Sequence, residues 1–96
     1  MTPLEKDIER KLCGKVKALG GRCEKLVNIG FAGFPDRTVL LPGRRVYFIE
    51  TKRPKGGREA ALQKKWRQWL TALGHECRTI WTFEELEEFL QHIQSQ

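Results

Sequence analysis

The chain lacks the features that mark membrane proteins, secreted proteins and several classes of enzyme. No apolar run approaches the roughly 18 residues of a membrane span, and no basic stretch followed by an apolar one opens the chain, so no secretory signal is expected. Three cysteines without paired spacing are expected to be reduced thiols in a cytoplasmic protein. The single serine, Ser95, leaves serine hydrolase chemistry unsupported, and neither a P-loop nor a dinucleotide-binding fingerprint is present.

What the chain does contain is the composition of one ordinary globular domain. It has 96 residues, of which 40% are hydrophobic and 31% are charged. A chain of this kind can bury a single modest core and is not disordered. We therefore expect one domain that spans residues 1–96.

The net charge of +6 is unevenly distributed. Seven basic residues and one acid, Glu59, lie between positions 52 and 67, whereas four acids and no Lys or Arg follow Thr82. A basic face attracts polyanions whatever the fold, so this pattern favours a nucleic-acid surface opposite an acidic one. A merely solvated charged surface explains the charge nearly as well.

Hydrophobic periodicity predicts a helix at the start of the chain. Thr2 is a typical N-cap, Pro3 suits the first helical position, and Glu5 completes a capping box. The pair Gly20-Gly21 marks the end of this helix. Its apolar face recurs at helical spacing and comprises Leu4, Ile8, Leu12, Val16 and Leu19.

Three strands are expected next. Alternation over residues 22–28 predicts the first, and a loop rich in glycine and proline follows at 30–35. The β-rich runs 37–41 and 45–51 are joined by a short Pro-Gly-Arg segment and predict a hairpin.

The second half of the chain is expected to form a helix, a strand and a last helix. The second helix ends at Gly74, and residues 75–81 suit a strand. A second capping box, Thr82 to Glu85, opens the last helix. The apolar stripe of the second helix, expected to be core rather than base-stacking, is Leu62, Trp66, Trp69 and Leu73. The inward residues of the last helix are Leu86, Phe89, Leu90 and Ile93.

The predicted hairpin brings three charged residues to one end of the sheet. If its turn centres on Gly43, Asp36 lies opposite Glu50, although a shift of one residue would pair Asp36 with Ile49 instead. Glu50 and Lys52 share an otherwise apolar face of their strand. Charged groups beside a buried face are costly unless they are paired or bound to a metal.

Two carboxylates that converge at a strand end supply the hard oxygen ligands that Mg²⁺ prefers. Lys52 can orient or help deprotonate an attacking water, or stabilise charge that develops on a phosphate. These parts describe metal-assisted phosphodiester hydrolysis. An ordinary Glu50–Lys52 ion pair and a turn capped by Asp36 explain either motif alone, but both motifs on adjacent strands favour the site.

The sequences GFPDR at 33–37 and FIETK at 48–52 resemble the motifs of the PD-(D/E)XK nuclease superfamily, and most closely those of its VRR-NUC branch, the virus-type replication-repair nuclease domains. The likeness extends to Lys25 and Gln63 and covers roughly residues 3–90. It implies an α/β fold with the restriction-endonuclease-like core, a mixed β-sheet flanked by helices in the order αβββαβα. The element order expected above is the same.

By this resemblance Asp36 and Glu50 are metal ligands, the backbone carbonyl of Thr51 is a candidate third ligand, and Lys52 is the catalytic lysine. The ion implied is Mg²⁺ or Mn²⁺. The expected DNA contacts are Lys25, Arg37, Arg53, Lys55, Arg58, Lys64 and Lys65.

Two further residues match family positions and have an alternative explanation each. Gln63 matches a helix position that supports the catalytic site, but glutamine is common in an early helical turn. Glu5 matches an acidic residue that lies near the metal, but its place in a capping box explains it equally well.

We therefore expect a metal-dependent DNA endonuclease that acts on branched DNA or Holliday junctions in replication or repair, in a bacterial or phage-type protein. The alternative is a non-catalytic nucleic-acid-binding module with the same fold. Because standalone members of the branch resemble junction resolvases in being dimers, a homodimer is expected. Phe31, Phe34 and the acidic last helix are candidate interface residues. The two phenylalanines could instead wedge against unstacked bases, or fold back onto the core of a monomer.

Overall fold

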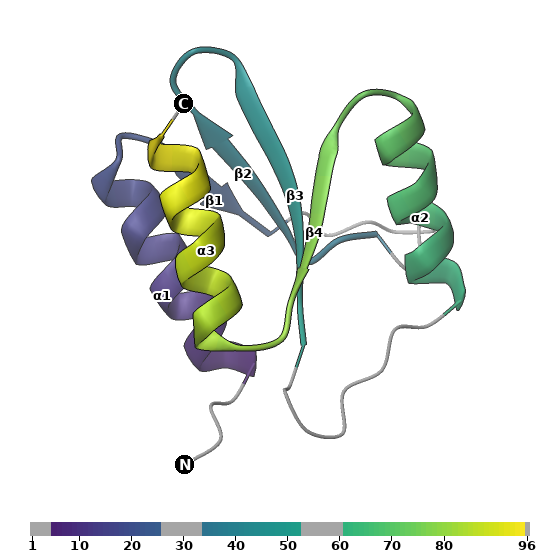
Figure 1. Ribbon diagram of the computed structural model, residues 1–96, viewed down its shortest axis with the longest axis horizontal. Coiled ribbons are helices and arrows are strands. Elements are labelled where there is room, and N and C mark those ends of the chain that lie inside the picture. Colours follow the sequence, from purple (N-terminus) through teal and green to yellow (C-terminus); the bar gives the residue numbers. More distant parts are fainter. Residues whose placement is uncertain (1–4, 26–33, 53–60, 96) are drawn as a thin grey trace.

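The computed structural model, described for residues 5–25, 34–52 and 61–95, has the predicted element order αβββαβα. Helices α1 and α3 lie side by side on one side of the sheet, and α2 lies on the other (Figure 1). The helices are α1 (Glu5–Ala18), α2 (Ala61–Ala72) and α3 (Phe83–Gln94). The strands are β1 (Arg22–Glu24), β2 (Arg37–Leu41), β3 (Arg45–Thr51) and β4 (Glu76–Ile80).

The sheet is mixed, as expected. Its strand order is β1-β2-β3-β4, in which the pairs β1–β2 and β2–β3 are antiparallel and the pair β3–β4 is parallel. A parallel pair needs a crossover connection, and α2 supplies it between β3 and β4.

The β2–β3 hairpin has the register predicted from a turn centred on Gly43. Arg37 pairs with Ile49, so the alternative register shifted by one residue is excluded. Gly43 has a φ of 83°, a left-handed conformation that costs glycine little. Continuing this register by one position sets Asp36 opposite Glu50.

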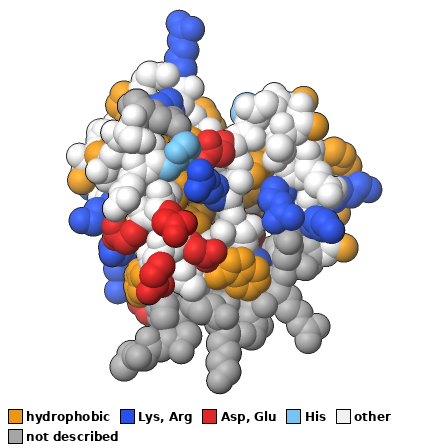
Figure 2. All heavy atoms as spheres, in the orientation of Figure 1, with side chains coloured by type: hydrophobic (Ala, Val, Ile, Leu, Met, Phe, Trp, Pro, Cys, Tyr) orange, Lys and Arg blue, Asp and Glu red, His pale blue; other side chains and the backbone are white. Residues whose placement is uncertain are grey.

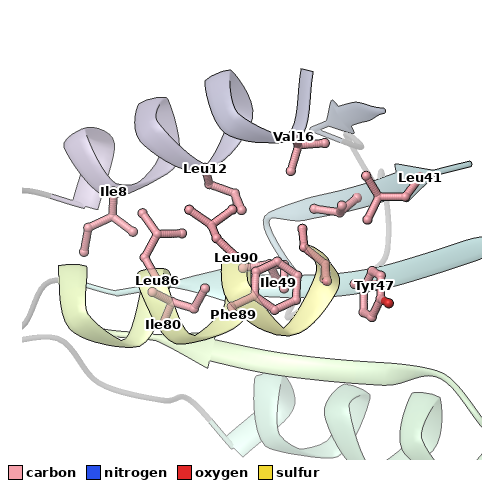
Figure 3. Packing of buried hydrophobic residues seen from close by; sticks show 12 residues of the cluster. Ile8, Leu12, Val16, Leu41, Tyr47, Ile49, Ile80, Leu86, Phe89 and Leu90 are labelled. Carbon is pink, nitrogen blue, oxygen red and sulfur yellow. The ribbon is translucent and has the colours of Figure 1, made fainter. Parts of the chain in front are cut away.

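The hydrophobic core fills the space between the sheet and the pair α1 and α3 (Figure 3). Its helical residues were predicted from their spacing, and all of them are buried: Ile8, Leu12, Val16, Leu86, Phe89, Leu90 and Ile93. The sheet contributes Val39, Leu41, Tyr47, Ile49 and Ile80. Side chains alternate along β3, so this face is filled by residues 47 and 49 while residues 48 and 50 face α2.

The predicted capping box of the last helix is present. The Thr82 hydroxyl accepts a hydrogen bond from the Glu85 backbone N–H, and the Glu85 carboxylate accepts one from the Thr82 backbone N–H. The predicted cap at Thr2 and Pro3, together with Leu4, lies outside the described residues.

The predicted burial was wrong for the apolar stripe of α2 and for Leu19. Leu62, Trp69 and Leu73 are 42%, 47% and 74% exposed, Leu19 is 36% exposed, and Trp66 is half-buried. Helix α2 buries only Leu70, because it packs mainly along β4 at the edge of the sheet. A helix that contacts the rest of the fold along one narrow strip leaves its other apolar side chains exposed to solvent.

The first predicted strand is present as Arg22–Glu24, and Lys25 is no longer part of it. The prediction ran to residue 28, but residues 26–33 lie outside the described part. None of the described helices combines the length and apolarity that a membrane crossing would require.

Candidate active site

Four elements meet at one end of the sheet, where β3 ends and β2 begins. Helices α1 and α2 both start near this end (Figure 1). Their early residues therefore reach the strand ends: Glu5 and Glu9 from α1, and Gln63 from α2. Asp36 directly precedes β2, and Glu50 lies near the end of β3.

On the α2 side, Gln63 joins Glu50 to Lys52. The Lys52 ammonium donates to Gln63 Oε1 at 2.8 Å, and Gln63 Nε2 donates to Glu50 Oε1 at 2.8 Å. The Lys52 nitrogen also lies 3.3 Å from Glu50 Oε1. The side chains of Lys52 and Glu50 are 12% and 10% exposed, so this group is shielded from water on most sides.

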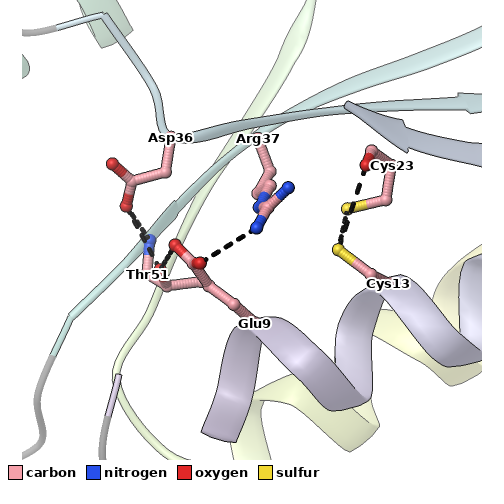
Figure 4. A network of polar contacts seen from close by, with 6 residues as sticks. All are labelled: Glu9, Cys13, Cys23, Asp36, Arg37 and Thr51. Carbon is pink, nitrogen blue, oxygen red and sulfur yellow. Dashed lines mark hydrogen bonds and ion pairs between the residues drawn. The ribbon is translucent and has the colours of Figure 1, made fainter. Parts of the chain in front are cut away.

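On the α1 side, Thr51 joins Asp36 to Glu9 (Figure 4). The backbone N–H and the hydroxyl of Thr51 both lie 3.1 Å from Asp36 Oδ2, and the hydroxyl is 3.0 Å from Glu9 Oε1. A hydroxyl has one proton, so it can donate to only one of these carboxylates at a time. Arg37 pairs with the second oxygen of Glu9 at 3.1 Å.

Negative charge is concentrated where the two groups meet. Carboxylate oxygens of Glu5, Glu9 and Asp36 lie within 4.8 Å of one another. Burial, and next the negative charge of Asp36, raise the pKa of Glu50 to about 7, although Lys52 acts in the opposite direction. Converging half-buried carboxylates are relieved by a cation, and an all-oxygen donor set suits Mg²⁺ or Mn²⁺. The residues present therefore fit the ion that the motifs imply.

The structure brings together five of the predicted site residues. Asp36, Glu50, Lys52 and Gln63 meet at the sheet end, and Glu5 reaches Asp36 through the carboxylate cluster. The backbone carbonyl of Thr51 as a metal ligand stays a prediction.

The predicted DNA-binding residues are placed less uniformly. Lys25, Lys64 and Lys65 are exposed. Arg37 is half-buried and bound to Glu9. The remaining three predicted contacts, Arg53, Lys55 and Arg58, lie outside the described residues.

Sequence reasoning missed Glu9. The available signal was its spacing, because residues four apart share one face of a helix and Glu9 follows Glu5 by four. It also missed that Cys13 and Cys23 are neighbours, with their sulfurs 2.7 Å apart (Figure 4). Both are free thiols, and burial raises the pKa of Cys23 well above its usual range. Their positions in the chain gave no hint of this contact, which the packing of α1 on β1 creates.

Comparison with known proteins adds independent observations. None of the known family models matches the sequence. A solved structure described as a VRR_NUC domain superposes with a TM-score of 0.81 at 23% identity, covering 94% of this chain and 98% of that one. A curated protein named "Putative nuclease p44", from Acyrthosiphon pisum secondary endosymbiont phage 1, is 39% identical over 72 residues, which are 75% of this chain and 76% of that protein. The chain belongs to the same family as this phage protein, and it has the fold of a VRR_NUC domain. This assignment confirms the resemblance carried by the VRR-NUC motifs at 33–37 and 48–52.

Proposed function

We propose that this chain is a divalent-metal-dependent nuclease that hydrolyses the phosphodiester bonds of DNA. The observation that carries the proposal is the convergence of Asp36 and Glu50 beside Lys52, a lysine held in place by Gln63. Family membership and the name of the phage relative support the same activity.

The proposed ion is Mg²⁺ or Mn²⁺, held by Asp36 and Glu50 with the Thr51 carbonyl, and with Glu5 and Glu9 close by. Bound there, it supplies Lewis acidity toward the phosphate and makes a water more acidic. Because the pKa of Glu50 is raised to about 7, part of this carboxyl is protonated near neutrality in the metal-free protein. Cation binding therefore has to displace that proton.

Lys52 is proposed to act on the reacting phosphate. Its ammonium is bound by Gln63 and Glu50, so it is oriented before the substrate arrives. A positioned ammonium in a shielded site stabilises the negative charge that grows on the phosphate in the transition state, or orients the attacking water. Gln63 hydrogen-bonds to both Lys52 and Glu50 and is thus a positioning residue.

The DNA is proposed to lie over the exposed lysines Lys25, Lys64 and Lys65, together with Arg53, Lys55 and Arg58 of the segment that is not described. Phosphate contacts of this kind give affinity without sequence information. The proposed substrates are branched structures such as flaps, forks and four-way junctions. Arg37 is left out of this set because its guanidinium is bound to Glu9.

A cleavage panel tests the proposed activity. Mg²⁺ and Mn²⁺ are expected to support cleavage of at least one branched substrate. Ca²⁺ is expected to permit binding with little cleavage, because it is larger, takes more ligands and activates water less. Labelled duplex, flap, fork and four-way junction DNA are incubated with each ion and with EDTA. Undiminished cleavage in EDTA would rule out a metal-dependent mechanism.

The functional unit is proposed to be a homodimer, because symmetric cleavage of a four-way junction needs two sites related by a two-fold axis. Most of the described residues that were expected at the dimer interface make contacts within the chain instead. Phe34 packs edge-on against Phe48 and Trp66, at 5.8 and 5.2 Å between ring centroids, and the apolar residues of α3 are in the core. Phe31 lies outside the described residues. Light scattering decides the point, since a mass near 11.2 kDa with and without junction DNA would reject the dimer.

A further inference from the structure

One face of α2 carries an aromatic ring that the proposed chemistry does not use. Trp69 is 47% exposed, and Leu62 and Leu73 are exposed on the same side of the helix, seven and four residues away. Large apolar side chains that gather on a surface mark a binding site more often than scattered ones do.

The Trp69 ring is held in place by its neighbours rather than lying loosely on the surface. It packs edge-on against Trp66, with 5.3 Å between ring centroids, and Trp66 packs in turn against Phe34 at 5.2 Å. Phe34 precedes Asp36 by two residues and also contacts Phe48 on β3. A chain of aromatic contacts therefore connects Trp69 to the strands that carry the active site.

The charge around Trp69 identifies the kind of partner. Helix α2 contains Lys64, Lys65 and Arg67 and has no acidic residue. The Lys65 ammonium lies 5.1 Å from the centre of the Trp69 ring. Basic and hydrophobic side chains appear together over α2 in Figure 2, whereas acidic ones gather over α3. A flat aromatic surface beside a cation matches a nucleotide, which offers a base to stack and a phosphate to neutralise.

The same charges argue against a second copy of the chain on this face. Two copies of α2 facing each other across a two-fold axis would bring six cations together without an acid from that helix. The helix is also continuous with the active site. Trp69 follows Gln63 by six residues, which is about 9 Å along the axis, or about three nucleotides at the spacing of one DNA strand.

We propose that Trp69, flanked by Lys65, is a stacking site for an unpaired nucleobase of the DNA strand, a few nucleotides from the bond that is cut. The stacking site rests on the proposed nuclease function, and it gives the nuclease a preference for DNA with unpaired bases beside the active site. Bases inside a duplex are stacked on each other and do not offer a free face, so the site discriminates single-stranded from paired DNA.

Binding measurements in EDTA test this directly, since they do not depend on cleavage. The probes are a labelled single strand of about 12 thymidines and a blunt duplex of equal length. Trp69→Leu is expected to weaken single-strand binding about tenfold, because a stacked base contributes roughly 1–3 kcal/mol, and to leave duplex binding unchanged. Trp69→Phe keeps an aromatic ring and is expected to retain most of the affinity.

Two control variants separate stacking from other effects. Leu19→Ala removes an exposed apolar side chain just after α1, on the other side of the sheet, and is expected to change neither affinity. Lys64→Ala is expected to weaken both probes alike, because a phosphate contact does not distinguish them. Melting temperatures of all variants establish that each one folds.

Unchanged single-strand affinity in Trp69→Leu, or an equal loss on the duplex, would overturn the stacking site. So would a fall from dimeric to monomeric mass in both Trp69→Leu and Leu73→Ala, which would assign this face to a second copy. The two proposals fail separately. A protein that cleaves with Mg²⁺ but shows no effect of Trp69→Leu loses only the stacking site, and one that shows the effect without cleaving any substrate loses only the nuclease function.

Discussion

The raised pKa of Glu50 makes the stability of the metal-free protein depend on pH, because the ionised carboxylate destabilises the folded state. Its pKa is raised to about 7 from an ordinary value of 4.5, first by burial and then by Asp36. The folded chain therefore binds this proton more tightly than the unfolded chain does. Between about pH 4.5 and 7 the stability falls as the pH rises, because the unfolded state ionises first.

Replacing this acid by its neutral isostere is expected to stabilise the metal-free protein at high pH. Glu50→Gln should exceed the wild type in unfolding free energy by roughly 3 kcal/mol at pH 8, since each pKa unit between 4.5 and about 7 corresponds to about 1.4 kcal/mol. Near pH 4.5 the wild-type carboxyl is protonated and the difference should vanish. Urea denaturation in EDTA at both pH values measures it. A Glu50→Gln protein less stable than the wild type at pH 8 would contradict the raised pKa.

Glu9 illustrates what a motif does not reveal. The patterns at 33–37 and 48–52 predicted Asp36, Glu50 and Lys52, because those residues lie on a hairpin whose register the turn defines. Glu9 lies on a different element, and its approach to Asp36 depends on how α1 docks on the sheet. Docking is a tertiary event with no local sequence signature, so only the spacing of Glu9 from Glu5 pointed to it.

Glu9→Gln is expected to weaken binding of Mn²⁺ several-fold, because it removes a negative charge from the carboxylate cluster. It should also lower the unfolding free energy by about 1–3 kcal/mol, since the half-buried Arg37 loses its charged partner. Calorimetric titration and urea denaturation give the two values. Glu84→Gln, an equal charge change on the exposed face of α3, is the matched control. Equal Mn²⁺ affinity in both variants would exclude Glu9 from the metal site.

At the level of elements, sequence patterns predicted best where a segment meets the core along its whole length. The periodicity of α1 and α3 matched the buried residues because both helices cover the same face of the sheet. The stripe of α2 was equally periodic and was nevertheless exposed at Leu62, Trp69 and Leu73. Periodicity shows that a face is apolar, but it cannot show whether a neighbour exists to cover it. The binding face proposed on α2 is therefore the place where the prediction of the core was wrong.

The capping box of α3 gives an element-scale prediction. Thr82→Ala removes the acceptor of the Glu85 N–H and is expected to cost about 1 kcal/mol in unfolding free energy. Thr82→Ser keeps a hydroxyl and is expected to restore most of that loss. Thermal or urea denaturation of the three proteins provides the comparison. If Thr82→Ala and Thr82→Ser are equally destabilised, lost methyl packing rather than the cap is responsible.

Across the whole molecule, the hydrophobic core and the basic surface of α2 lie on opposite sides of one sheet. The core lies with α1 and α3, and the acids of α3 gather on that side (Figure 2). Helix α2 and its cations lie on the other side, and the carboxylates sit at the sheet end where the two sides meet. A DNA strand drawn to α2 would thus reach the carboxylates at the end of β3. This arrangement gives each site variant a defined expectation, namely lost cleavage with DNA binding retained.

Cleavage by the Glu50→Gln protein tests the central claim most directly. Its activity on the best branched substrate in Mg²⁺ should fall by at least about a hundredfold, with comparable losses in Asp36→Asn and Lys52→Ala. DNA binding should persist or tighten in the two carboxylate variants, because negative charge near the phosphates is removed. Glu84→Gln is the control for charge and should cleave like the wild type. Wild-type cleavage by a folded Glu50→Gln protein would contradict the assignment of this site.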